Sequence, residues 1–207
     1  MFRIATPIPV PGSQPNILLD AGANAEVQPE WLVQFAQMGS IYARHRFGIA
    51  SPKVGLLSIG EEPGKGDTLR KEAYELLAAA SGIQFVGNVE GRDLMKKTAD
   101  VIVTDGFVGN VVLKVCEGLF DFMIKMVAQE LNQTLENEKD LAKKALHTLI
   151  SRYDYSAFGG APLLGIDGIC IISHGSSGER AIANALALAA KLARAGINNQ
   201  IVQELDQ

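Results

Sequence analysis

The sequence predicts an α/β fold in three layers (α/β/α), with helices on both faces of a mostly parallel sheet. Short runs of apolar residues alternate with helical stretches along the chain. These runs are apolar at consecutive positions rather than at every second position, as is typical of strands covered on both faces. No repeat, low-complexity tract or Gly/Ser linker divides the 207 residues. We therefore expect a single domain over residues 1–207.

Each element follows from a local pattern. Proline cannot donate a hydrogen bond to a neighbouring strand, so the start of the chain is expected to hold no central strand. Its prolines are Pro7, Pro9, Pro11 and Pro15. The apolar runs predict strands at 16–20, 53–59, 83–86, 100–104 and 168–173. Helical spacing of apolar residues predicts helices at 29–47, 67–80, 89–97 and 181–195.

Residues 111–151 are an exception, because this stretch is too long for one crossover helix in a compact domain. It consists almost entirely of helix-forming residues and has a polar break at 136–140, which predicts a helical hairpin that projects from the sheet. A projecting pair of helices has little core with which to cover its apolar side chains, so we expect a homodimer. Packing of the helices on each other and on the sheet explains part of the pattern equally well. The expected dimer contacts include Phe122, Met126, Leu141 and Leu146.

The composition excludes some classes of function. The net charge of -4 has the wrong sign for a protein that binds nucleic acid through its overall field. Both cysteines lie in apolar runs, and no segment reaches the ~20 apolar residues that span a bilayer, so the chain is expected to be cytoplasmic. The histidines lie in different elements without metal-binding spacing, and no dinucleotide-binding glycine motif follows a strand. We expect neither a metal nor a cofactor.

Four loops combine glycine with polar residues, and each follows a predicted strand and precedes a predicted helix. They span 20–24, 60–66, 104–110 and 174–177. Parallel strands end at the same edge of a sheet, so we expect the four loops to converge there. Glycine lets the backbone approach a ligand closely, and the first amides of a helix attract anions. The pattern therefore predicts a cleft that binds phosphate or another anion.

The individual loops allow more than one interpretation. Residues 60–66 lack the spacing of a nucleotide-binding P-loop, and Lys65 is either a charge for a single phosphate or an exposed surface lysine. His174 and Ser176 are neighbours in one short loop, an arrangement that rarely supplies both base and nucleophile. We expect Ser176 or Ser177 to cap the last helix instead.

Compared as strings, these loops and their flanking residues resemble the fatty acyl-phosphate synthases, the acyl carrier protein:phosphate acyltransferases of bacterial phospholipid synthesis. The matching stretches are 18–24 (LLDAGAN), 54–62 (VGLLSIGEE) with 65–66, 87–94 (GNVEGRDL), 99–110 (ADVIVTDGFVGN), 155–165 (ending in GGAPLLG) and 174–177 (HGSS). They follow the family's order along the chain. Family members begin with a further stretch that is absent here, so the chain resembles their C-terminal part.

The resemblance implies transfer of an acyl group from the thioester of acyl carrier protein to inorganic phosphate. Lys65 and Asn110 are then the expected catalytic residues, which orient phosphate or the thioester oxygen. The other residues expected to bind substrate or phosphate are Asn24, Gly64, Gly66, Asp105, Gly109, His174 and Ser176. In the family, the helical excursion serves homodimerisation and, at its tip, reversible membrane contact. Three acidic residues among positions 136–140 predict that any membrane contact here is weak or peripheral.

Two alternatives stay open. A coenzyme A-dependent phosphate acetyl- or butyryltransferase resembles the family in architecture and chemistry, although the matching strings argue against it. A shortened chain kept as a dimerising module without catalytic activity is a different class of function. Thiol release with acyl carrier protein but not with coenzyme A separates the two enzymes, and release with neither favours the module.

Overall fold

The computed structural model describes residues 2–153, 158–175 and 177–205. Its strands form a seven-stranded sheet in the order β4-β3-β5-β2-β1-β6-β7. The strands are β1 (Arg3–Ile8), β2 (Asn16–Leu19), β3 (Lys53–Leu57), β4 (Gln84–Val89), β5 (Val101–Val103), β6 (Ala161–Leu164) and β7 (Ile171–Ile172). The helices are α1 (Pro29–Phe47), α2 (Thr68–Ala79), α3 (Gly106–Thr134), α4 (Lys139–Tyr153), α5 (Glu179–Ala195) and α6 (Ile197–Leu205), with a 3-10 turn η1 (Gly91–Asp93).

One half of the sheet is parallel and the other is antiparallel. β4, β3, β5 and β2 run in the same direction. β1 is antiparallel to β2, β6 is antiparallel to β1, and β7 is antiparallel to β6. The loops that follow β2, β3 and β5 therefore leave at one edge, whereas the loop that follows β7 leaves at the opposite edge. The predicted α/β/α architecture is confirmed, and its antiparallel part was not predicted from the apolar pattern.

The start of the chain differs from the prediction, because β1 is a central strand that contains Pro7. β6 pairs with β1 only at Arg3 and Ile4, so no second strand among the described residues pairs with β1 at Pro7. Ile4 O accepts a hydrogen bond from Ala21 N, on the β2 side. The backbone N–H and C=O groups of successive residues point to alternate sides of a strand. The nitrogen of Pro7, three residues after Ile4, therefore points away from β2. The missing N–H is therefore not needed, as at an edge strand.

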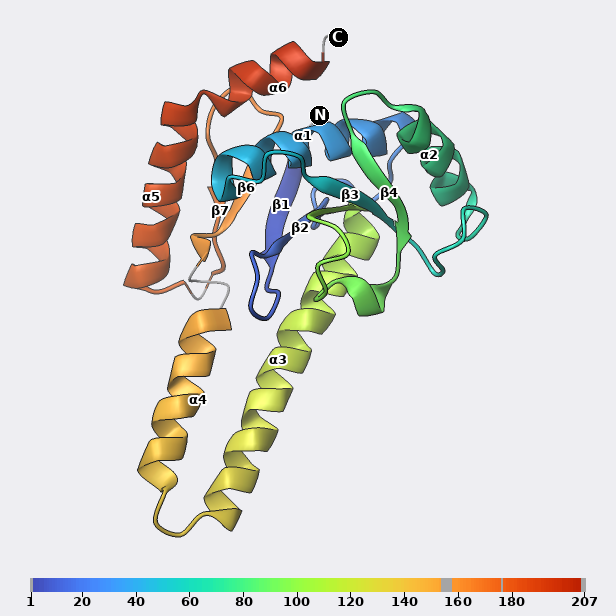
Figure 1. Ribbon diagram of the computed structural model, residues 1–207. Helices are drawn as coiled ribbons and strands as arrows, with labels where there is room; N and C mark the ends of the chain where they lie inside the picture. Colours follow the sequence, from blue (N-terminus) through green and yellow to red (C-terminus); the bar gives the residue numbers. More distant parts are fainter. Residues whose placement is uncertain (1, 154–157, 176, 206–207) are drawn as a thin grey trace.

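The two faces of the sheet are covered unequally. α1 packs on one face between α2 and α6, and Figure 1 shows these helices together on the upper side of the sheet. α1 approaches β5 closely at Gly39, where a Cβ atom would lie 2.5 Å from Val101 Cγ1. The other face carries a smaller core, in which Leu18 and Ile102 of the sheet are packed by Val112 and its neighbours in α3.

α3 and α4 form the predicted hairpin, and Figure 1 shows both helices extending away from the sheet. α3 begins at Gly106 rather than at Val111, and the turn lies between Thr134 and Lys139. α4 contains no buried residue. α3 leaves an apolar stripe in solvent, whose members are each 48–56% exposed: Val111, Val115, Leu119, Phe122, Met123 and Met126. None of the described helices has the length and apolar character needed to cross a membrane.

The other differences lie mainly in the second half of the chain. The helix expected at 89–97 is only the turn η1, where Glu90 and Asp93 form a capping box. The strand expected at 168–173 contracts to the two residues of β7. Besides β1, two elements lie outside the prediction, β6 and α6. α6 is separate from α5 because Gly196, with φ +63, ends α5 in a left-handed conformation.

Candidate functional site

Three of the four glycine-containing loops lie together at one edge of the sheet. They follow β2, β5 and β3, and β5 lies between the other two strands. Backbone hydrogen bonds join the loops after β2 and β5: Asp20 N donates to Thr104 O over 3.0 Å, and Gly106 N donates to Asn24 O over 2.7 Å. We call residues 20–24, 58–70 and 104–110 the edge site.

Asp20 organises the loop after β2. Its side chain is fully buried, and its carboxylate accepts hydrogen bonds of 2.8–3.1 Å from the amides of Ile4 and residues 22–24 and from the side chain of Asn24. Asn24 Nδ2 also donates to Phe2 O over 2.7 Å. The amides of this loop are therefore engaged with the protein itself. Asn24 is a predicted phosphate ligand. Its side-chain amide donates to Asp20 and to Phe2 O and so holds the loop in place.

The first turn of α3 packs directly on this loop. Gly109 is buried against Asp20, and a Cβ atom on Gly109 would lie 1.9 Å from Asp20 O. Asn110 comes next, is exposed and lies beside Gly22, since a Cβ atom on Gly22 would be 3.4 Å from Asn110 Cβ. Gly109 thus permits the close approach of helix and loop, and Asn110 is the polar side chain that this turn presents to solvent.

The loop after β3 presents Lys65. Its side chain is exposed, and its ammonium group pairs with no carboxylate in the described part of the chain. The main chain is fixed, because Lys65 N donates to Glu62 O over 3.0 Å and Ser58 Oγ donates to Lys65 O over 3.3 Å. Gly66 adopts φ +102, which favours glycine, while Gly64 is exposed with open space around it.

Arg70 joins this loop to the start of α3 and is absent from the predicted site. It is 8% exposed. Its guanidinium donates to Asp67 over 2.8 Å, to Thr104 Oγ1 over 3.1 Å and to the Asp105 carboxylate. A basic residue in the first turn of a helix opposes the helix dipole, and this position is the signal from which Arg70 can be noticed in the sequence.

The helix starts at this edge are less open to an anion than the sequence suggests. Asp67 caps α2 by accepting a hydrogen bond from Arg70 N over 2.9 Å, and Asp105 caps α3 by accepting one from Val108 N over 2.8 Å. Each cap occupies an amide and adds a negative charge. Asp105 is 5% exposed and paired with Arg70. Asp105 thus caps a helix and holds an arginine, and its expected role as a phosphate ligand stays a prediction.

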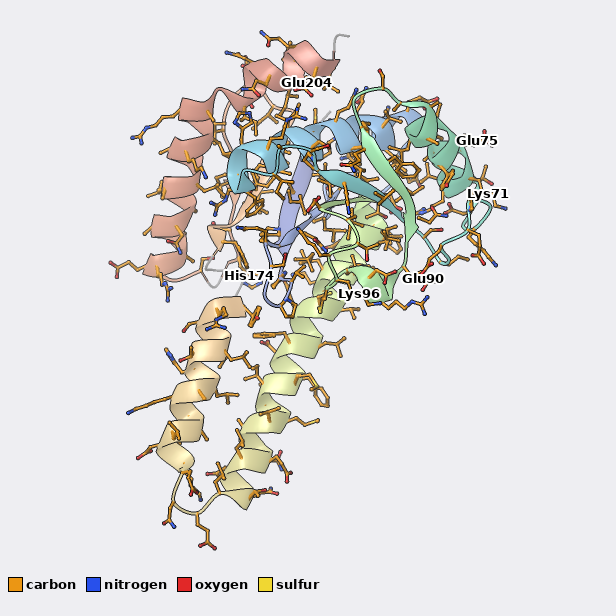
Figure 2. All side chains as sticks on the ribbon, viewed as in Figure 1. Lys71, Glu75, Glu90, Lys96, His174 and Glu204 are labelled. Carbon is orange, nitrogen blue, oxygen red and sulfur yellow. The ribbon has the colours of Figure 1, made fainter. Side chains whose placement is uncertain are left out.

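The fourth loop lies elsewhere. Because β7 runs opposite to β2, β3 and β5, His174 follows β7 at the opposite edge of the sheet, and Figure 2 shows it well apart from Glu90, which follows β4. The prediction that all four loops converge is wrong for this loop, because it assumed a parallel β7. Ser176 lies outside the described residues. α5 has Gly178 at its N-cap position and no side-chain cap, so Ser177 does not cap it.

An unpredicted charged cluster links Glu61 of the edge site to two acidic residues that follow β4. Glu61, Glu90 and Asp93 bring carboxylate oxygens within 4.8 Å of one another. Arg92 pairs with Glu61 at 3.3 Å and with Glu90 at 2.6 Å, and Lys96 pairs with Asp93 at 2.9 Å. The hydrogen bond from Lys96 lowers the pKa of Asp93. These partners neutralise most of the cluster's charge and engage its oxygens.

Comparison with known proteins places the chain in a family. Its sequence matches the family model described as "Fatty acid synthesis protein" over residues 3–200. It is 46% identical to the phosphate acyltransferase of Dictyoglomus thermophilum, over 99% of this chain and 61% of that protein. It is 52% identical to the phosphate acyltransferase of Elusimicrobium minutum, over 91% of this chain and 56% of that protein. The chain thus spans about three fifths of the length of these relatives.

A solved structure has a similar fold at low sequence identity. It is a branched-chain phosphotransacylase from Enterococcus faecalis V583, with a TM-score of 0.57 and 16% identity, covering 92% of this chain and 63% of that one. The likeness concerns the fold alone. The family is set by the sequence match over residues 3–200, which agrees with the resemblance seen in the loops: this chain belongs to the fatty acid synthesis protein family.

Proposed function

We propose that the chain takes part in acyl transfer to phosphate, at the edge site. The acyl group leaves the thioester of acyl carrier protein and joins inorganic phosphate, which gives an acyl phosphate for phospholipid synthesis and a free carrier thiol. Family membership and relatives named phosphate acyltransferase support this reaction. The observation that carries the proposal is the exposure of Lys65 and Asn110 on two adjoining loops at one edge of the sheet.

The reaction places modest demands on the protein. A phosphate oxygen attacks the carbonyl carbon of the thioester, the carbonyl electrons move onto its oxygen, and the intermediate then expels sulfur as a thiolate. Phosphate is already an anion at neutral pH, and a thiol with a pKa of ~8.5 is a good leaving group, so no strong base or acid is required. The protein has to position the two reactants and stabilise the developing oxyanion.

Lys65 and Asn110 have the chemistry for these tasks. The ammonium group of Lys65 is a point charge for phosphate, with Gly64 and Gly66 giving the backbone room beside it. The amide of Asn110 is a neutral donor for phosphate or for the thioester oxygen. His174 remains a weaker candidate, because it lies at the other edge of the sheet.

The outer stripe of α3 supports a second copy of the chain as a partner. Phe122 is 56% exposed, Met126 49% and Leu141, on α4, 69%, whereas Leu146 is half-buried and lines a hollow between the two helices. Burial of large apolar side chains is the main stabilising term of a homodimer interface. We propose a homodimer through the hairpin. Its acidic turn supports weak rather than strong membrane contact.

The alternatives keep some support. The similar fold of a branched-chain phosphotransacylase fits a coenzyme A-dependent enzyme. The length of the chain, about three fifths of its relatives, fits a module without activity of its own. The relatives' names favour an enzyme over the module, because they are named for acyl transfer to phosphate. The matching loop strings argue for the carrier protein over coenzyme A as acyl donor.

The test is thiol release in the presence of phosphate. The chain is assayed alone and joined to the N-terminal segment that family members add, with palmitoyl-acyl carrier protein and with palmitoyl-coenzyme A. We expect phosphate-dependent thiol release and acyl phosphate from the carrier protein only. Release from coenzyme A instead would favour the second enzyme, and release from neither in the joined protein would favour the module.

A further inference from the structure

The place of Arg70 in α2 is unfavourable unless it has partners outside its helix. The start of a helix carries a partial positive charge, and a buried cation needs compensating groups. Arg70 is the third residue after the cap Asp67, and the first turn of α2 holds no acidic residue. It is also 8% exposed. The tertiary contacts of its side chain therefore account for its position.

Those contacts join two loops of the edge site, the one after β3 and the one after β5. Nη1 donates to Asp67 Oδ2 over 2.8 Å, and Nη2 donates to Thr104 Oγ1 over 3.1 Å and to the carboxylate of Asp105. The stem packs under Gly66, where a Cβ atom would lie 2.7 Å from Arg70 Cβ. One side chain thus touches the loop after β3, the residue that follows β5 and the cap of α3.

We infer that Arg70 is a positioning residue, which fixes the spacing between Lys65 and Asn110 and so determines how tightly phosphate is bound. The inference rests on the proposed function. Lys65 directly precedes Gly66, and Asn110 lies little more than one helical turn after the cap Asp105. Both side chains therefore take their places from groups that Arg70 holds, although Arg70 itself does not contact phosphate.

The shape of the guanidinium, rather than its charge alone, carries this role. A planar fork can donate to Asp67 on one side and to Thr104 and Asp105 on the other, whereas an ammonium group has one centre on a flexible stem. Arg70→Lys therefore keeps the charge and loses the bridge. Asp67→Asn weakens one arm of the bridge and keeps the helix cap, because asparagine caps as well as aspartate.

The test compares the Michaelis constant for phosphate in the joined protein with backbone hydrogen exchange in the chain itself. Arg70→Lys is expected to raise the KM for phosphate about tenfold with a smaller change in kcat, because misplaced binding groups weaken binding. Asp67→Asn is expected to raise KM about threefold. Exchange at 104–110 is expected to speed up in Arg70→Lys, because the start of α3 loses its tether.

Arg44→Lys is the matched control. Arg44 pairs with Glu204 at 2.6 Å, and Figure 2 places Glu204 on α6, away from Glu90 and from Lys71, the residue that follows Arg70. This variant also loses an arginine ion pair but is expected to leave KM and exchange at 104–110 unchanged. An unchanged KM in both edge variants of an active protein, or unchanged exchange at 104–110 in Arg70→Lys, overturns the inference. If the wild type forms no acyl phosphate, the proposed function fails and exchange alone decides on Arg70.

Discussion

The first turn of α3 and the part of the helix that projects from the sheet are packed differently. In its first turn, Gly109 lies so close to the loop after β2 that a Cβ atom would be 1.9 Å from Asp20 O. Further along the same helix, Gly118 has nothing within 4 Å of such an atom, and Phe122 is 56% exposed. The first turn is fixed by backbone contact and by its cap, whereas the outer part carries large apolar side chains that no described residue covers.

This difference separates two requirements within one helix. A site that orients small groups needs a rigid backbone and small residues at close contacts. An association surface needs exposed apolar area and does not depend on close backbone contacts. We therefore expect substitutions near the first turn to affect folding and chemistry, and substitutions in the outer part to affect oligomeric state.

The largest expected effect distinguishes the two ends by the same substitution. Gly109→Ala is expected to lower the free energy of unfolding by about 3 kcal/mol, because either the loop after β2 or the helix must shift. Gly118→Ala is expected to raise it by about 1 kcal/mol, since alanine favours a helix over glycine where space is open. Urea denaturation followed by circular dichroism measures both. Equal effects of the two substitutions would remove the contrast.

A charge on the outer stripe is expected to break the homodimer. Phe122→Glu places a carboxylate on the exposed apolar face and should cost about 2 kcal/mol of association, about a 30-fold rise in dissociation constant. Asp121→Lys, on a neighbouring face of the same turn, is the control and should leave the dimer intact. Sedimentation velocity at micromolar concentration checks both. A monomeric wild type contradicts the dimer.

The smallest effect concerns thiol reactivity. Burial raises the pKa of the Cys116 thiol, which lies half-buried in α3, whereas Cys170 is exposed before β7. The thiolate is the reactive form, so we expect Cys170 to react about tenfold faster than Cys116 with a disulfide reagent at pH 8. Mass spectrometry of the labelled peptides gives the two rates. Faster labelling of Cys116 would show that α3 is more open than described.

The sequence predicts the edge site better than the rest of the sheet. The loops after β2, β3 and β5 follow apolar runs, each flanked by a helix, and such order favours parallel strands. The direction of β7 is not contained in its few apolar residues, because it depends on β1 and β6, whose pairing is set by tertiary contacts. The prediction that Pro7 excludes a central strand fails for the same reason. A proline nitrogen costs no hydrogen bond where no second strand among the described residues pairs with β1.

Two roles in the site are recoverable from local chemistry. Asp105 precedes a glycine and a helical stretch, which is the pattern of a capping residue rather than of an anion ligand. Arg70 opposes the dipole of its helix and therefore indicates a partner elsewhere. That its partner is Asp105 could not be read from the chain, because 34 residues lie between them in the sequence.

The central claim is that Lys65, at the edge site, binds the phosphate that accepts the acyl group. Its most direct test is the phosphate dependence of acyl-phosphate formation by the joined protein carrying Lys65→Ala. The control is Lys71→Ala, which removes an exposed lysine of α2 shown in Figure 2. We expect Lys65→Ala to raise the KM for phosphate at least about tenfold, Lys71→Ala to leave it unchanged, and unfolding to be unaltered in both variants. Wild-type phosphate dependence in Lys65→Ala would contradict the claim.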